Sequence, residues 1–312
     1  MFKGIVSTSK ETEYDVLLIG EIVVDEIFDQ QNIKYLSYGG SPANIALNLT
    51  QLGLNPLLVA ALGEDSEGAF LQDTLSRYNM RTDMIFKVNT ATSKVQLTDS
   101  KERPIPVFNR LSDYLIPYSD LLESRISETK ILHFSYWPLT KEPAKSTVLK
   151  SIKKAKKSGV LVAFDPNIHH DLYSDDSISH EELLGLLKFV DIIKPSLDDA
   201  ARLFGEGYSK ESYMDFFEAA GIQLILMTLG KDGVYVSHHG KRTLYGTNEV
   251  DVVDATGAGD AFWSGFYAGL INGLNLTESI DCAQKISALV LKSIGAITEL
   301  PRFECFTLKE KS

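Results

Sequence analysis

The strongest constraint on the fold of this chain is a series of short apolar runs separated by more polar segments. Each run is about five to eight residues long and apolar on both faces, which is typical of strands covered on both sides in a parallel sheet. The runs lie at residues 15–20, 57–62, 131–136, 160–164, 189–194 and 222–229.

Helix-like segments separate these runs. Residues 67–78 and 144–157 carry apolar side chains at helical spacing, with basic residues on the outer face. Strands that alternate with helices predict a doubly wound α/β fold, in which helices flank a mostly parallel sheet. Ligands of such folds bind beyond the carboxyl ends of the strands. We therefore singled out four residues that follow apolar runs: Asp25, Asp165, Lys194 and Gly230.

Two polar segments, 25–38 and 84–110, interrupt this alternation. Partial alternation, as at 85–88 and 94–97, favours antiparallel strands with one solvated face. We expect these strands to form a small β-sheet lid over a site. The chain would then be one domain, with a core of about 13–27, 41–84 and 111–312 and a lid of about 28–40 and 85–110.

Composition restricts the function. The 312 residues include 31 basic and 42 acidic side chains, a net charge of −11, which argues against binding nucleic acid or an anionic membrane by bulk charge. An anionic ligand must therefore be held by local groups. Residues 1–14 lack the apolar stretch of a signal peptide, and no run reaches the ~20 apolar residues of a membrane helix. With Cys282 and Cys305 as the only cysteines, a cytoplasmic protein is expected.

The segment Tyr38-Gly39-Gly40-Ser41-Pro42-Ala43-Asn44 indicates a turn followed by a helix. Ser41 is the predicted N-cap of that helix. Adjacent glycines let the backbone approach a ligand closely, and Asn44 in the first turn is placed to hydrogen-bond hydroxyls. The alternative is that this segment only connects a loop to a helix and binds no ligand.

The segment from Asp254 to Asp260 is a glycine-rich turn that opens a helix. Backbone N–H groups of Gly257, Ala258 and Gly259 would form an anion hole at the positive end of the helix. A carboxylate at Asp260 is favoured there by the helix dipole, and it is placed to take a proton from a hydroxyl during phosphoryl transfer. Asp260 as a simple N-cap is the alternative. Neither Gly-x-Gly-x-x-Gly nor a P-loop is present, which disfavours a dinucleotide-dependent oxidoreductase.

Together the two segments resemble the Gly-Gly-x-x-x-Asn and Asp-Thr-x-Gly-Ala-Gly-Asp signatures of the ribokinase-like (PfkB) carbohydrate kinases, and the chain resembles a fructokinase-like member over roughly residues 14–301. The resemblance implies ATP-dependent phosphorylation of a sugar primary hydroxyl, with Mg²⁺ and K⁺ as cofactors. It makes Asp260 the general base and Gly257, Ala258 and Gly259 the anion hole.

The resemblance also assigns binding roles. The sugar would be bound by Asp25, Gly39, Gly40, Asn44, Arg110, Asp165 and Asn167. The nucleotide would be bound by Lys194, Thr228, Gly230, Gly233 and Gln284. Asp254, with the backbone near residues 293–298, resembles a monovalent-cation site. Asp199 would hold Mg²⁺ through water, although this chain reads Ser196-x-x-Asp199 where the family carries Asn-x-x-Glu.

Several alternatives stay open at this point. His169 stands where fructokinase-like and ketodeoxygluconate-kinase-like members often carry Arg. A neutral His binds a substrate carboxylate less well than Arg does, which favours a neutral sugar such as fructose or ribose. A kinase of the same fold for 2-keto-3-deoxygluconate or a nucleoside is the nearest alternative. A non-catalytic sugar- or nucleotide-binding regulator is another. Lid edges often pair between subunits in this family, which would make the protein a homodimer.

Overall fold

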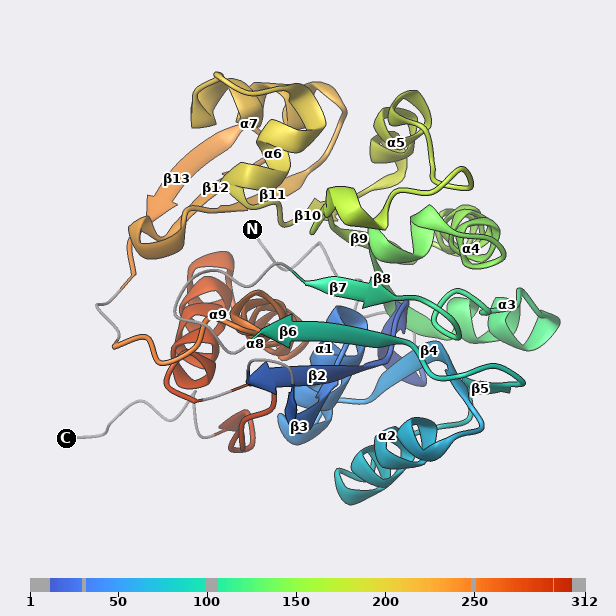
Figure 1. The fold of residues 1–312 in the computed structure, drawn as a ribbon. Helices are drawn as coiled ribbons and strands as arrows, with labels where there is room; N and C mark the ends of the chain where they lie inside the picture. Colours follow the sequence, from blue (N-terminus) through green and yellow to red (C-terminus); the bar gives the residue numbers. More distant parts are fainter. Residues whose placement is uncertain (1–11, 30–31, 99–105, 248–250, 294, 305–312) are drawn as a thin grey trace. The chain divides into compact units, whose positions relative to one another are not determined.

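The computed structural model describes residues 12–29, 32–98, 106–247, 251–293 and 295–304 (Figure 1). The chain divides into two compact units, one of residues 1–116 and 250–312 and the other of residues 117–249. Within the described ranges, no helix combines the length and the apolar character needed to cross a membrane. Some residues with a predicted role lie outside the described residues. They are Cys305, residues 30–31 and 99–105 of the predicted lid, and residue 294 of the predicted cation site.

The first unit contains three parallel strands of the predicted kind. Strands β1 (Tyr14–Ile19), β4 (Pro56–Gly63) and β5 (Ile85–Val88) pair in that order. Helices α1 (Ser41–Gln51) and α2 (Ser66–Arg77) lie on either side of β4 in the sequence. Every residue of β4 is buried, as the apolar run predicted.

The prediction of an antiparallel lid strand at residues 85–88 is wrong. Strand β5 pairs parallel with β4, with Ala60 opposite Ile85. It is the last strand of its sheet within the described parts of the chain, where one side of it has no neighbouring strand. An edge position leaves side chains partly solvated and produces the same partial alternation as an antiparallel strand.

A separate four-stranded sheet is present in this unit. Its order is β3 (Asn32–Gly39), β2 (Val23–Asp29), β6 (Lys94–Thr98) and β7 (Val107–Asn109). The outer pairs are antiparallel, but β2 and β6 run parallel, so the sheet is mixed. Asp25 lies on this sheet, opposite Ser37. The division of the chain into core and lid stays a prediction.

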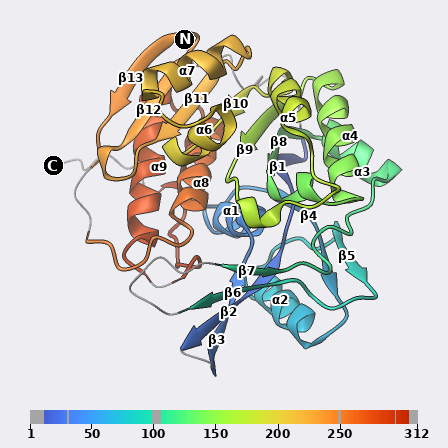
Figure 2. The ribbon, with the colours of Figure 1, turned by 45° about the horizontal axis from the view of Figure 1, so that its top comes forward.

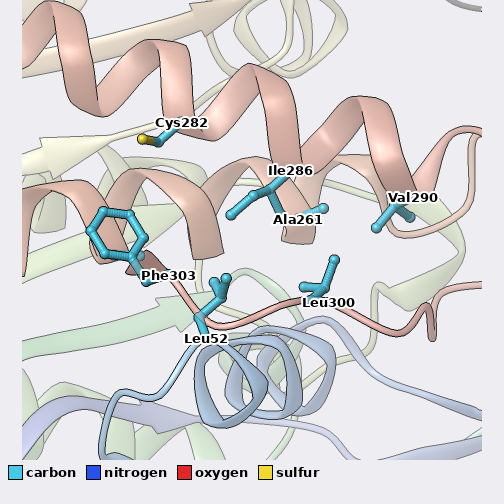
Figure 3. Close-up of a cluster of buried hydrophobic side chains, with 8 residues drawn as sticks. Leu52, Ala261, Cys282, Ile286, Val290, Leu300 and Phe303 are labelled. Atoms are coloured by element: carbon cyan, nitrogen blue, oxygen red, sulfur yellow. The ribbon is translucent and has the colours of Figure 1, made fainter. Parts of the chain in front are cut away.

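Helices α8 (Ala258–Ile271) and α9 (Leu276–Val290) pack closely at small residues of α8. A Cβ atom at Gly265 would lie 2.7 Å from the Cα of Ala283. Figure 3 shows the apolar side chains of Ala261, Ile286 and Leu300 facing one another beside these helices. This core fixes the start of α8, where the candidate base lies.

The second unit repeats the alternation of strands and helices. Parallel strands β8 (Thr129–Ser135), β9 (Leu161–Asp165), β10 (Ile192–Ile193) and β11 (Leu224–Thr228) are followed by the antiparallel strands β12 (Val234–His238) and β13 (Lys241–Tyr245). The α-helices are α3 (Asp120–Ser127), α4 (Ala144–Lys157), α5 (His180–Leu186), α6 (Leu197–Phe204) and α7 (Lys210–Ala219). The 3₁₀ helices are η2 (Trp137–Thr140), η3 (His170–Leu172), η4 (Leu187–Phe189) and η5 (Gly230–Asp232). Figure 2 shows α3 and α4 side by side, and both contact β8.

Candidate active site

Asp260 lies in the first turn of α8. Gly257 is the N-cap, with a φ of 76°, and a Cβ atom there would lie 2.9 Å from the Cα of Ala296. Glycine is therefore required on both conformational and steric grounds. The first N–H groups of a helix lack intrahelical acceptors and carry a partial positive charge, so Gly257, Ala258 and Gly259 lie where an anion can be held.

Helix α1 fixes both oxygens of the Asp260 carboxylate. The Ser41 hydroxyl donates to Oδ1 over 2.6 Å, and the Asn44 amide donates to Oδ2 over 2.9 Å. Hydrogen bonds to a charged acceptor are stronger than neutral ones, so these two hold the carboxylate in one orientation. The residues come from the two segments that the sequence singled out.

The prediction that Ser41 caps helix α1 is wrong. The N-cap is Gly40, which has no side chain to cap with, and its φ of 103° makes the turn into the helix. Ser41 is the first helical residue, and its hydroxyl points to Asp260 instead of back to the helix. A capping residue and a site residue have the same sequence pattern, so only the fold separates the two roles.

The adjacent glycines leave room for two acidic residues. A Cβ atom at Gly39 would lie 2.5 Å from both carboxylate oxygens of Asp25, and one at Gly40 would lie 2.5 Å from the backbone oxygen of Glu21. Burial raises the pKa of Asp25 to about 7, and the negative charge of Asp260 adds to the rise. Asp25 and Asp260 therefore belong to one electrostatic cluster.

Glu21 is a further member of this cluster that the sequence reasoning did not assign. It lies two residues after the end of β1, is 2% exposed, and accepts the backbone N–H of Ser41 over 3.1 Å. Burial raises its pKa to about 8, against the hydrogen bond from Ser41, and the charges of Asp113 and Asp260 act in the same direction as burial. An acidic residue directly after the mostly apolar run 15–20 was the available signal.

Asp254 fixes the loop before α8. One carboxylate oxygen accepts the N–H and hydroxyl of Thr256, and the other accepts the N–H of Gly295 over 2.8 Å. Burial alone would raise the pKa of Asp254, but these hydrogen bonds lower it below its ordinary value. This hydrogen bond joins Asp254 to the segment 293–298, and the monovalent-cation site expected there stays a prediction.

Arg110 forms a buried ion pair. Its Nε and Nη2 atoms donate to one carboxylate oxygen of Asp113 over 2.9 and 2.8 Å, and the Ser93 hydroxyl donates to the other over 2.6 Å. The side chains of Arg110 and Asp113 are only 6% and 0% exposed. A direct contact between Arg110 and the sugar stays a prediction. Gln284 lies half-buried on α9.

In the second unit, Asp165 and Lys194 also form a buried ion pair. Asp165 ends β9, Lys194 follows β10, and their charged atoms lie 3.2 Å apart. Burial lowers the pKa of the neighbouring His133 to about 3, and the positive charge of Lys194 adds to the effect. Asn167 is exposed, with an unusual φ of 37°.

Asp199 closes a capping box at the start of α6. One oxygen accepts the hydroxyl of Ser196 over 2.6 Å, and the other accepts the N–H of Ile168 over 2.8 Å. A Ser-x-x-Asp pattern before an apolar run therefore has a structural explanation here. The oxygen bonded to the Ser196 hydroxyl also accepts the Ser196 N–H over 3.0 Å, so metal-bound water would have to use the oxygen that accepts from Ile168.

The predicted phosphate loop follows β11. Thr228 is its last strand residue, and Gly230 and Gly233 have φ values of 58° and 95°. A Cβ atom at Gly233 would lie 2.0 Å from the backbone oxygen of Tyr245, so only glycine fits. The roles of these residues toward a nucleotide stay predictions.

Comparison with known proteins covers nearly the whole chain. A model described as the pfkB family of carbohydrate kinases matches residues 14–302. The chain is 43% identical, over 93% of its length and 92% of the relative's, to the ATP-dependent 6-phosphofructokinase of Thermoanaerobacterium thermosaccharolyticum.

Solved structures share the fold. The fructokinase of Halothermothrix orenii is 31% identical, with a TM-score of 0.77 over 91% of this chain and 99% of that one. A fructokinase double mutant from Vibrio cholerae O395, in its fructose-, ADP- and potassium-bound form, is 25% identical, with a TM-score of 0.82 over 96% and 98%. These likenesses confirm the α/β fold that the sequence predicted.

Proposed function

Because this chain belongs to the pfkB family of carbohydrate kinases, we propose that it transfers the γ-phosphoryl group of ATP to a primary hydroxyl of a fructose-like sugar. The family resemblance predicted from the two signature segments is confirmed, and with it a sugar kinase of ribokinase-like fold. The observation that carries the proposal is the Asp260 carboxylate, held by Ser41 and Asn44 at the start of α8.

Asp260 acts as general base in this proposal. Hydrogen bonds from Ser41 and Asn44 orient both of its oxygens. A carboxylate can accept about four hydrogen bonds in all, and one from a sugar hydroxyl can be among them. The hydroxyl oxygen attacks the γ-phosphorus in line, its proton passes to Asp260, and the bond to the leaving ADP breaks. The N–H groups of Gly257, Ala258 and Gly259 stabilise the charge on the phosphoryl oxygens.

In the proposed sugar site, Asp25 accepts hydroxyl hydrogens, and Gly39 and Gly40 let the backbone approach, beside the amide of Asn44. Arg110 remains a candidate contact. Asp165 and Asn167 are proposed as sugar ligands on the family resemblance alone. Kinases for 2-keto-3-deoxygluconate or nucleosides remain alternatives.

A sugar phosphate is the second candidate substrate. It is favoured by the 43% identity to a relative named 6-phosphofructokinase. Such a substrate carries a charged phosphate in addition to the hydroxyl that is phosphorylated. The neutral sugar inferred from His169 and the sugar phosphate therefore differ by one phosphate group, and an assay with both substrates distinguishes them.

We further propose that Lys194, Thr228, Gly230, Gly233 and Gln284 contact ATP. Mg²⁺ fits Asp199, because that cation prefers oxygen ligands and usually keeps several waters. Among the described residues, no three His, Cys, Asp or Glu side chains gather as a metal cluster, which suits an ion carried by phosphates and water. The ion would neutralise charge on the transferred phosphate.

Potassium fits the loop held by Asp254, whose carboxylate and backbone carbonyls are hard oxygen donors. Support comes from the potassium ion named with the Vibrio cholerae fructokinase. A homodimer paired through the small sheet and a cytoplasmic location are proposals that rest on the family resemblance.

A coupled assay of ADP formation tests the proposed reaction. Fructose, fructose 6-phosphate, ribose, 2-keto-3-deoxygluconate and a nucleoside are compared with Mg²⁺, with and without K⁺. We expect turnover with fructose or its 6-phosphate and stimulation by K⁺. Sugar or nucleotide binding without ADP formation from any substrate would instead support a non-catalytic regulator.

A further inference from the structure

Glu21 is a buried carboxyl group that the proposed reaction leaves without a role. One of its oxygens, Oε1, accepts the backbone N–H of Ser41 over 3.1 Å. The other, Oε2, is buried and has no hydrogen-bond partner in the part of the chain that the structure describes. The residue is 2% exposed, so bulk water does not solvate this oxygen.

The charges around Glu21 are negative. Asp260 of α8 and Asp113, which follows β7, both act on it electrostatically. Asp113 is already paired with Arg110, and within the described residues no ion pair joins a cation to Glu21. A carboxylate with one unpartnered buried oxygen, next to two other carboxylates, is much costlier than a neutral carboxyl group in the same place.

A short chain of contacts connects Glu21 to the candidate base. Glu21 accepts the N–H of Ser41, and the hydroxyl of the same Ser41 donates to Oδ1 of Asp260. Gly40, with its φ of 103°, precedes Ser41 and forms the turn that Glu21 fixes. The position of the Ser41 hydroxyl, and hence of the Asp260 carboxylate, depends on this contact.

We propose that Glu21 is a positioning residue that acts in its neutral, protonated form and holds Asp260 in place through Ser41. This inference rests on the proposed kinase reaction. The neutral form keeps the acceptor for Ser41 and adds no charge beside Asp260. A pKa raised to about 8 by burial and by the two nearby carboxylates supports the same protonation state.

Ionised Glu21 would repel the Asp260 carboxylate and displace it, so kcat should fall as the pH rises through about 8. In Glu21→Gln the amide oxygen still accepts the Ser41 N–H, but nothing ionises. We expect its kcat at pH 7 to stay within about threefold of wild type, its KM for ATP to be unchanged, and this alkaline fall to be absent. Glu21→Ala removes the acceptor and should lower kcat about tenfold or more.

Glu26→Gln is the matched control. Glu26 is also buried, but its carboxylate pairs with Lys94 on the small sheet. This variant should keep the alkaline fall. Thermal unfolding of each variant separates a loss of positioning from a loss of folded protein.

Infrared difference spectra test the protonation state without substrate. At pH 7, wild type minus Glu21→Gln should show the C=O band of a protonated carboxyl group. If no substrate is phosphorylated, the proposed function fails while this band still reports the state of Glu21. Three results would overturn the proposal that Glu21 is protonated. They are absence of the band, an alkaline fall of kcat retained in Glu21→Gln, and a tenfold lower kcat of folded Glu21→Gln at pH 7. Normal kcat in Glu21→Ala would overturn positioning.

Discussion

The side-chain amide of Asn44 donates to Oδ2 of Asp260 over 2.9 Å and joins the first turns of helices α1 and α8. The two residues are 216 positions apart in the sequence. Ser41, one turn earlier on the same helix face, holds the other oxygen of this carboxylate. The start of α1 therefore orients the base that the start of α8 provides.

Removing either donor should slow the chemical step. A hydrogen bond to a charged group contributes about 1.5–3 kcal/mol, so Ser41→Ala and Asn44→Ala should each lower kcat about 10- to 100-fold. KM for ATP should change little. Ser264→Ala is the control, because its hydroxyl bonds the backbone oxygen of Asp260 and not the carboxylate. Steady-state kinetics check this, and equal kcat losses in all three variants would contradict it.

Gly39→Ala should impair binding of the sugar. The added Cβ atom would lie 2.5 Å from both oxygens of Asp25, so this carboxylate must move. We expect KM for the sugar to rise about tenfold or more, the effect of one lost charged hydrogen bond, with a smaller change for ATP. Gly185 of α5 is a matched control, because a Cβ there meets nothing within 4 Å. An unchanged KM for the sugar in Gly39→Ala would count against Asp25 as a sugar ligand.

The stability of the protein should depend on pH through Glu21. A carboxyl group whose pKa is higher in the folded chain takes up a proton on folding, so the stability it contributes is lost as the pH rises. For Glu21 this window runs from 4.5 to about 8. The free energy of unfolding of Glu21→Gln, relative to wild type, should therefore increase with pH there, by at most about 1.4 kcal/mol per pH unit. Urea unfolding across the window measures it, and a constant difference would contradict the shifted pKa.

Arg110→Ala should destabilise the fold. Its partner Asp113 is 0% exposed, and breaking a buried ion pair from one side costs about 3–5 kcal/mol. The double variant with Asp113→Asn should recover part of the loss, because no unpaired charge remains. Chemical denaturation checks both. Unchanged stability together with a raised KM for the sugar would show Arg110 to be a substrate contact instead.

The sequence predicted best those features that depend on local pattern. All residues of strand β4 are buried, and the apolar run 57–62 predicted a strand covered on both faces. Strand β5 was misassigned because an edge strand and a half-solvated antiparallel strand leave the same alternation.

Contacts between distant segments could not be predicted in this way. Ser41 has the sequence context of a helix cap, and its contact with Asp260 depends on how α1 packs on α8. Glu21 was likewise not assigned, because its neighbours Asp113 and Asp260 are brought to it by the fold. The residue types of the site were visible in the sequence, but their partners required the structure.

The most direct test of Asp260 as the general base is the turnover of Asp260→Asn. Asparagine keeps the size of the side chain and an oxygen that can accept from Ser41, but it cannot take a proton from the sugar. With fructose or fructose 6-phosphate at saturation, we predict that kcat falls about 10²–10⁴-fold while the protein stays folded. Turnover of folded Asp260→Asn close to that of wild type would contradict this assignment.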